Sequence, residues 1–297
     1  MAIRTNLDMD ALRTFVTGLE LGSFARAADR LGRSPSAVSA QLRKLEEQVG
    51  RPLVHKAGRG LALTDAGEGL LGYARRILGL NDEALDAVRG AEMAGWVRLG
   101  LPQDFAEGWL PGVLGRFARA HPKVRVEVRA ERSARLVERT VKGELDLALA
   151  WGDSSGAPHA ERVAELPAVW IGRADWGGIA SLGSEPLPLV AFEPPCVFRD
   201  AGVAALGAVG IAWRLAFTSP SLAGLWAAAE AGLGVTLRTG VGVPAGLTVL
   251  DPVAASLPAL PSMPLTLHVA DAGPAPAVAR LAEILRDTIA ERTGRPV

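Results

Sequence analysis

A chain of 297 residues exceeds the usual size of one domain, so its length favours two domains, or a small domain joined to a two-lobed one. Although 49% of the residues are hydrophobic, no uncharged apolar run of about 20 residues stands out, which disfavours a membrane helix. The single cysteine, Cys196, excludes an intrachain disulfide and a thiol cluster for zinc or iron–sulfur chemistry. The four histidines lack ligand spacing, so we expect no metal and no cofactor.

Charge is divided unevenly along the chain. Residues 1–63 carry ten Arg and Lys against six Asp and Glu, whereas the net charge of the whole chain is zero. A basic N-terminal module on a mildly acidic body fits a nucleic-acid reader joined to another domain. The first residues lead into a charged amphipathic segment, without the apolar region and cleavage site of a signal peptide. We therefore expect a cytoplasmic protein with no membrane partner.

The first 50 residues predict three helices. Leu12, Phe15, Val16 and Leu19 form an apolar stripe with helical spacing, which Gly22 ends. Ser23 is placed to cap a second helix over 24–31, in which alanines permit close packing. Gly32 ends that helix, and a third begins with Ser34 at the N-cap and Pro35 at the first helical position.

The third helix predicts a surface for DNA. Its buried stripe is Val38, Leu42, Leu45 and Val49, and the opposite face carries short and basic side chains, namely Ser36, Ser39, Ala40, Arg43 and Lys44. Two short helices joined by a turn containing Gly are typical of a helix-turn-helix, whose second helix enters the major groove by its N-terminal end. On periodicity alone, a plain helical hairpin is the alternative.

A basic hairpin is predicted next. Residues 53–63 alternate around a Gly-rich tip that carries Lys56 and Arg59. As a wing, this tip would place both side chains on the sugar-phosphate backbone; otherwise it is a soluble turn. Taken together, residues 1–63 predict a winged helix-turn-helix domain, mainly α.

Five short segments resemble LysR-type transcriptional regulators: residues 12–15 (LRTF), 22–28 (GSFARAA), 34–46 (SPSAVSAQLRKLE), 50–53 (GRPL) and 63–67 (LTDAG). The resemblance continues more weakly through the chain and implies a linker helix followed by an effector domain shaped like a periplasmic solute-binding protein. Within the family, the region around Pro195 and Cys196 is most similar to the LrhA-type branch.

The resemblance also implies which residues touch DNA. The chain departs from the family at Pro35, where glutamine is more frequent, and at Ser36, where proline is more frequent. A base-reading side chain is thus missing, while Ala27, Ala28 and Val38 are assigned to packing. The expected DNA contacts are Arg26, Ser34, Pro35, Ser36, Ser39, Arg43, Lys56 and Arg59.

Residues 64–92 predict a linker helix that mediates dimerisation. Thr64 can cap a helix that runs to about Ala91 without proline. A repeat of 3.5 residues places Leu70, Ala74, Ile77, Asn81, Ala84, Val88 and Ala91 on one seam. Leu70, Ile77, Asn81 and Val88 are therefore the expected oligomerisation residues, and a polar Asn81 would fix the register. Packing of the helix on its own domain is the alternative. The resemblance implies dimers that assemble into tetramers.

Residues 93–297 predict an α/β effector domain with two lobes. Strands over 96–101, 124–128 and 143–149 alternate with helices over 105–120 and 133–142. Lobe I would comprise residues 93–162 and 265–297, and lobe II residues 163–264. Lobe II holds strands at 188–192 and 213–217 and a helix from Ser219 to Ala231, and a final helix spans 276–293. Two crossings of the chain between lobes predict a hinge that closes around a solute.

A ligand should bind where strands of both lobes end. The expected contacts each follow a predicted strand and are Gln103, Asp104, Phe105, Arg132, Ser133, Trp151, Cys196, Thr218, Ser219 and Arg238. Ser133 and Ser219 either bind a carboxylate at a helix N-terminus or cap their own helices. Asp104 would repel anions, which favours an effector that is neutral or carries an amine or hydroxyl, unless this residue caps its helix. Cys196 is either an effector or redox contact or a small buried apolar residue.

These expectations describe a DNA-binding regulator whose partners are double-stranded promoter DNA, an unidentified small molecule, further copies of the chain and, as an additional partner, RNA polymerase. It would act as an activator, a repressor or both. An enzyme is disfavoured because no nucleophile turn, metal cluster or phosphate loop is visible. A transport solute-binding protein is disfavoured because about 90 N-terminal residues precede the two-lobed body.

Overall fold

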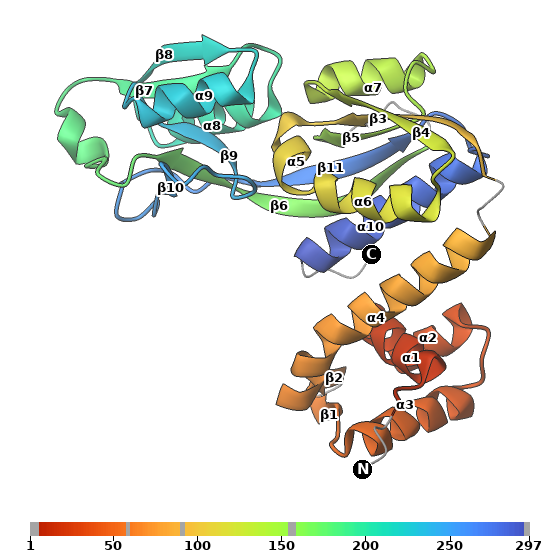
Figure 1. Cartoon of the computed structure of the whole chain (residues 1–297). Helices are drawn as coiled ribbons and strands as arrows, with labels where there is room; N and C mark the ends of the chain where they lie inside the picture. Colours follow the sequence, from red (N-terminus) through yellow and green to blue (C-terminus); the bar gives the residue numbers. More distant parts are fainter. Residues whose placement is uncertain (1–5, 58–59, 90–92, 154–158, 294–297) are drawn as a thin grey trace. The chain divides into compact units, whose positions relative to one another are not determined.

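The computed structural model describes residues 6–57, 60–89, 93–153 and 159–293. The chain forms two compact units: the first holds the residues up to 92, with Arg119–Pro122 grouped with them, and the second holds residues 93–118 and 123–293 (Figure 1). None of the helices within these ranges is long and apolar enough to span a bilayer.

The first unit contains α1 (Met9–Glu20), α2 (Phe24–Arg30), α3 (Pro35–Val49) and a hairpin of β1 (Val54–Ala57) and β2 (Gly60–Leu63). The predicted caps are confirmed, since the hydroxyls of Ser23 and Ser34 accept the amides of Arg26 and Ala37 at 3.3 and 3.2 Å. A core containing Leu12, Phe15, Leu45 and Leu53 joins the elements. The order of helices and hairpin is that of a winged helix-turn-helix.

The long helix α4 (Asp65–Arg89) follows directly, and the Thr64 hydroxyl caps it by accepting the Gly67 amide at 3.1 Å. Gly67 is required here because a β-carbon at this position would lie 2.1 Å from the Leu53 carbonyl oxygen. The first turns of α4 pack on α1, with Ala74 and Leu78 buried in the common core. An ion pair between Arg13 and Asp82, with 2.5 Å between their closest atoms, extends this contact.

The second unit is built on a mixed sheet in the order β4, β3, β5, β11, β6, β10, with β9 also paired to β6. The strands are β3 (Gly95–Leu101), β4 (Val124–Ala130), β5 (Leu147–Trp151), β6 (Ala160–Gly172), β9 (Thr236–Thr239), β10 (Thr248–Val249) and β11 (Ser262–Val269). β3 runs parallel to β4 and β5, whereas β11 is antiparallel to β5 and β6. In lobe I, helix α7 (Ser133–Val141) covers one face, and α6 (Leu110–Ala120) and α10 (Pro276–Thr293) cover the other (Figure 1).

Lobe II contains the parallel strands β7 (Leu187–Phe192) and β8 (Trp213–Ser219), the helices α8 (Val197–Ala208) and α9 (Leu222–Glu230) and a short 3-10 helix, η2 (Ile179–Leu182). Val235, just before β9, forms a bridge with Leu189 of β7. Strand β6 is shared by both lobes, because its first part pairs with β11 and its last residues pair with β9 and β10. This crossing strand was not predicted from the sequence.

One predicted helix is interrupted. Residues 105–120, expected as a single helix, form α5 (Gln103–Gly108) and α6, with a break at Trp109. Pro111 explains the break, since proline lacks the amide donor that a continuous helix would need at this position and its ring clashes with the preceding turn. As the second residue of α6, it is tolerated because the first turn of a helix has no acceptors to offer.

Candidate functional site

The solvent-facing side of α3 carries the side chains expected to contact DNA. Val38 and Leu45 face the core, whereas Ser36, Ser39 and Arg43 are exposed on the other side of the helix. Ser34 and Pro35, at the start of the helix, and Arg26 on α2 are also exposed. The helix therefore presents its N-terminal half to solvent with short side chains, as insertion into the major groove requires.

Hydrogen bonds within the domain hold several of these groups. The Ser39 hydroxyl donates to the Pro35 carbonyl at 2.9 Å, and the Ser34 and Ser36 hydroxyls lie 3.0 Å apart. Lys44 forms an ion pair with Asp8 at 2.6 Å, and this hydrogen bond lowers the pKa of Asp8. Because Lys44 already has a carboxylate partner, Arg43 is the better placed cation of α3 for DNA.

The wing forms as predicted in its backbone, with Lys56 of β1 paired to Leu61 of β2. Arg59 lies outside the described residues, and only the backbone of Lys56 is described. The predicted contacts of these two residues with the sugar-phosphate backbone stay predictions.

The seam predicted on α4 divides into two parts. Leu70 and Ile77 lie partly buried against the core of their own domain, so the alternative of internal packing holds for this half. Asn81 donates to the neighbouring Asp82 at 3.0 Å instead of facing an empty seam. Farther along, Val88 is 82% exposed, and other large apolar side chains exposed on α4 are Tyr73, Leu80 and Leu85. The large apolar side chains left exposed on α4 are therefore Val88, at the far end of the predicted seam, and Tyr73, Leu80 and Leu85 outside it.

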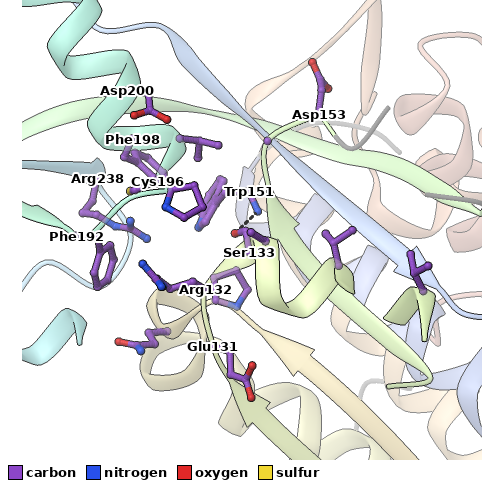
Figure 2. Close-up of a pocket in the computed structure, with 18 residues that line it drawn as sticks. Glu131, Arg132, Ser133, Trp151, Asp153, Phe192, Cys196, Phe198, Asp200 and Arg238 are labelled. Carbon is purple, nitrogen blue, oxygen red and sulfur yellow. Dashed lines mark hydrogen bonds between the residues drawn. The ribbon is translucent and has the colours of Figure 1, made fainter. Parts of the chain in front are cut away.

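A cavity of about 400 Å³ lies between the two lobes of the effector domain (Figure 2). Lobe I contributes Pro102, Gln103, Glu131, Arg132, Ser133, Ala134, Val137, Val141, Trp151, Gly152 and Asp153 to its wall. Lobe II contributes Phe192, Pro195, Cys196, Val197, Phe198, Asp200 and Arg238. The volume falls in the range of small-molecule sites, and the wall is largely apolar with a few charged groups, as such sites usually are.

Six of the ten predicted effector contacts line this cavity: Gln103, Arg132, Ser133, Trp151, Cys196 and Arg238. Phe105 instead belongs to the core, where its ring packs against Trp109 and Trp151, and Thr218 and Ser219 are not among the lining residues. The α7 face with Ala134, Val137 and Val141 was missed, as was the start of α8 with Val197, Phe198 and Asp200. Ala134, Val137 and Val141 recur at helical spacing within the predicted helix over 133–142, so this set could have been found from the sequence, whereas Val197, Phe198 and Asp200 share no such spacing.

Asp104 corrects the expectation about charge. Its carboxylate is buried, forms an ion pair with Arg238 of lobe II and accepts the Trp151 indole N–H at 3.0 Å. The Arg238 guanidinium lies 4.2 Å from the centre of the Phe198 ring and 5.0 Å from that of Phe192. Asp104 neither caps α5 nor projects a free charge into the mouth of the site. The expectation that it repels anions is wrong.

The two serines also have different roles from those expected. Ser133 is the first residue of α7, and its hydroxyl accepts the Trp151 amide at 2.8 Å, so it does not cap that helix (Figure 2). The Ser219 hydroxyl accepts the Ser221 amide at 3.0 Å, one residue before α9 begins. The Leu222 amide at the start of α9 donates instead to Gln103 Oε1 at 2.6 Å, across the two lobes.

Arg132 is a second link between lobes. Its guanidinium points across the cavity towards Phe192 and Arg238, and Nη1 donates to the carbonyls of Glu193 and Pro194 at 2.9 and 3.4 Å (Figure 2). Two of the carboxylates around the cavity are engaged elsewhere: Glu131 pairs with Arg139 at 3.1 Å and Asp153 with Arg162 at 2.6 Å. In the part of the chain that the structure describes, no group of three or more His, Cys, Asp or Glu could hold a metal ion.

Comparisons with known proteins agree with this architecture. Residues 9–68 match the family model described as the bacterial regulatory helix-turn-helix protein of the lysR family, and residues 90–290 match the LysR substrate binding domain. The HTH-type transcriptional regulator DgdR of Burkholderia cepacia is 37% identical over 283 residues, which cover 95% of this chain and 94% of DgdR. PecT of Dickeya dadantii is 36% identical over 79% of this chain and 73% of its own.

Solved structures show the same fold. The LysR-type regulator CrgA of Neisseria meningitidis superposes with a TM-score of 0.61 at 23% identity, covering 98% of this chain and all of CrgA. The narrower resemblance to the LrhA-type branch stays a prediction. With both family models matched in order and a relative similar over nearly its whole length, this chain belongs to the LysR family of transcriptional regulators.

Proposed function

We propose that this regulator binds promoter DNA sequence-specifically through α3 and that a small molecule in the inter-lobe cavity changes this binding without being consumed. The observation that carries the proposal is the cavity itself, whose wall is shared by residues of both lobes. A ligand that touches both lobes favours their closed arrangement by its difference in affinity for the closed and open states.

Base contacts are assigned to the exposed face of α3. Arg43 can donate to guanine, and Ser36 and Ser39 are short enough to let the helix approach the bases closely. Pro35 brings no donor, so we assign Pro35 and Ser34 to shaping the helix start, while Arg26 is exposed and suited to a phosphate. Lys56 and Arg59 are proposed to contact the backbone from the wing.

Further copies of the chain are the second proposed partner. The exposed apolar stripe of Tyr73, Leu80, Leu85 and Val88 on α4 would be covered in a dimer, and dimers would pair into tetramers. The bound oligomer would act as an activator or a repressor, with RNA polymerase as a further partner at activated promoters. Because the DNA that it would bind is chromosomal, the regulator would work in the cytoplasm.

The test has two stages. Sequencing the DNA that co-purifies with the full chain identifies the operator, and fluorescence anisotropy then measures operator affinity against a panel of metabolites. The control is the Val137→Trp variant, in which a larger side chain on α7 would fill the cavity and exclude a ligand. A metabolite should change the affinity of the unmodified chain by about fivefold or more but leave the Val137→Trp variant unaffected. Equal responses of both proteins, or no response to any metabolite, would contradict regulation through this cavity.

A further inference from the structure

Three helices of the effector domain begin where the lobes meet. The N-cap positions of α7 and α8 are Arg132 and Cys196, and neither makes a side-chain hydrogen bond to the first turn of its helix. Residues of both first turns line the cavity: Ser133 and Ala134 from lobe I, and Val197, Phe198 and the acidic Asp200 from lobe II. Helix N-termini carry partial positive charge and amides without helical acceptors, so this part of the cavity favours an anion.

Two guanidinium groups point to the same ligand chemistry. The hydrogen bonds described for Arg132 go to carbonyl oxygens, so they do not neutralise its charge. Arg238 is about nineteen-twentieths buried and lines the cavity, and its Nε lacks a hydrogen-bond partner among the described residues. A buried donor without a partner is costly, and a ligand oxygen would relieve that cost. At this end of the cavity Arg132 therefore supplies the positive charge, while Arg238, whose charge is balanced by Asp104, supplies a hydrogen-bond donor.

The third helix is occupied by the protein itself. Gln103 extends from lobe I, and its Oε1 accepts the Leu222 amide at 2.6 Å, while its Nε2 lies 3.5 Å from the Pro220 carbonyl. The carboxamide oxygen therefore takes the place that a second anionic group would take at the start of α9. Gln103 itself is part of the cavity wall, so its side chain separates the α9 terminus from a ligand.

We propose that Gln103 determines the ligand selectivity of this cavity by restricting the effector to one carboxylate. The single carboxylate lies at Arg132 and the starts of α7 and α8. The rest of the molecule is apolar, because Pro102, Val137, Val141, Trp151 and Phe192 form much of the remaining wall. This inference rests on the proposed function, in which the effector binds between the lobes.

The test uses matched pairs of simple acids as probes: pentanoate with glutarate, hexanoate with adipate, and heptanoate with pimelate. Members of a pair have equal carbon number and differ by the second carboxylate, and all are fully ionised at pH 7.5. Affinities for the full chain are measured by isothermal titration calorimetry at one fixed ionic strength, since dianions respond more strongly to screening. We expect each monocarboxylate to bind about tenfold more tightly than its dicarboxylate partner.

Two variants of the same residue separate selectivity from structure. Gln103→Ala exposes the α9 terminus, and it should improve binding of at least one dicarboxylate about tenfold while changing its monocarboxylate partner by less than about threefold. Gln103→Glu keeps an oxygen on the Leu222 amide and adds negative charge, so it should retain or increase the preference for monocarboxylates. Arg132→Gln should weaken both members of each pair.

Two binding results would contradict the proposal. An unchanged ratio between mono- and dicarboxylates in Gln103→Ala means that this residue only links the lobes, and a failure of all six acids to bind the unmodified chain means that the cavity is not a carboxylate site. Operator affinity is measured beside each titration. Probes that bind with the expected selectivity but leave operator binding unchanged would contradict the regulatory function and not the selectivity.

Discussion

The buried ion pair between Asp104 and Arg238 gives the sharpest prediction about stability. Only 1% of the Asp104 side chain and 6% of the Arg238 side chain are exposed, so removing one partner leaves the other charge buried and uncompensated. Asp104→Leu and Arg238→Met should each lower the free energy of unfolding of the effector domain by about 3 to 5 kcal/mol. With a slope of about 2 to 3 kcal/mol per M, this moves the urea midpoint down by about 1 to 2.5 M.

The double variant supplies the control. In Asp104→Leu/Arg238→Met no charge is left buried, and the main remaining loss is the acceptor of the Trp151 indole N–H, worth about 1 to 3 kcal/mol. The double variant should therefore be more stable than either single variant. Intrinsic fluorescence follows this domain selectively in the full chain, because all seven tryptophans lie at or beyond Trp96. Single variants that cost less than about 1 kcal/mol, or a double variant that costs the sum of both, would refute the reasoning.

Three further predictions address the caps, a buried histidine and the oligomer. Ser34→Ala removes the hydroxyl that accepts the Ala37 amide and should cost the helix-turn-helix domain about 0.5 to 2 kcal/mol by circular dichroism, whereas Ser34→Asp should preserve the cap. His268 is buried, neither ring nitrogen has a hydrogen-bond partner among the described residues, and burial lowers its pKa. Because the unfolded chain takes up the proton below about pH 6.5 and the folded chain does so only at lower pH, stability falls on acidification by up to about 1.4 kcal/mol per pH unit. In urea titrations from pH 7.5 to 5, His268→Leu should gain stability relative to the unmodified chain as the pH falls, and a constant difference would contradict this. Leu80→Glu and Val88→Glu should shift sedimentation towards smaller species, while Asn81→Leu, whose side chain contacts Asp82 next to the ion pair with Arg13, should leave assembly unchanged.

The local features of the fold could be predicted from the sequence because each depends on neighbouring residues. Ser23, Ser34 and Thr64 cap helices through amides three residues away, and the apolar stripe of α1 follows from helical spacing alone. Trp151 and Ser133 were likewise predicted as effector contacts because each follows a predicted strand, and both line the cavity. These elements supplied most of the residues needed to place the candidate site.

The links between lobes could not be predicted in the same way. Asp104 and Arg238 are separated by 134 positions, and Gln103 and Leu222 by 119, so their pairing depends on how the two lobes close. Strand β6 escaped prediction because Pro167 interrupts its pattern, although that proline is accommodated opposite Ser262 at the end of the β11 ladder. The seam of α4 was assigned by a 3.5-residue repeat, but α1 covers its first half, so only Val88 at its far end is free, and Tyr73, Leu80 and Leu85 are exposed beside the seam.

The measurement that tests the central claim most directly compares Arg43→Ala with Lys56→Ala in operator binding. Affinities for the operator and for unrelated DNA are measured by anisotropy across a series of salt concentrations. We predict that Arg43→Ala loses about 1 to 3 kcal/mol of operator affinity, with little change on unrelated DNA. Lys56→Ala should weaken binding to both DNAs equally and reduce the salt slope by about one. Equal effects of Arg43→Ala on operator and unrelated DNA would contradict the claim that α3 reads the sequence.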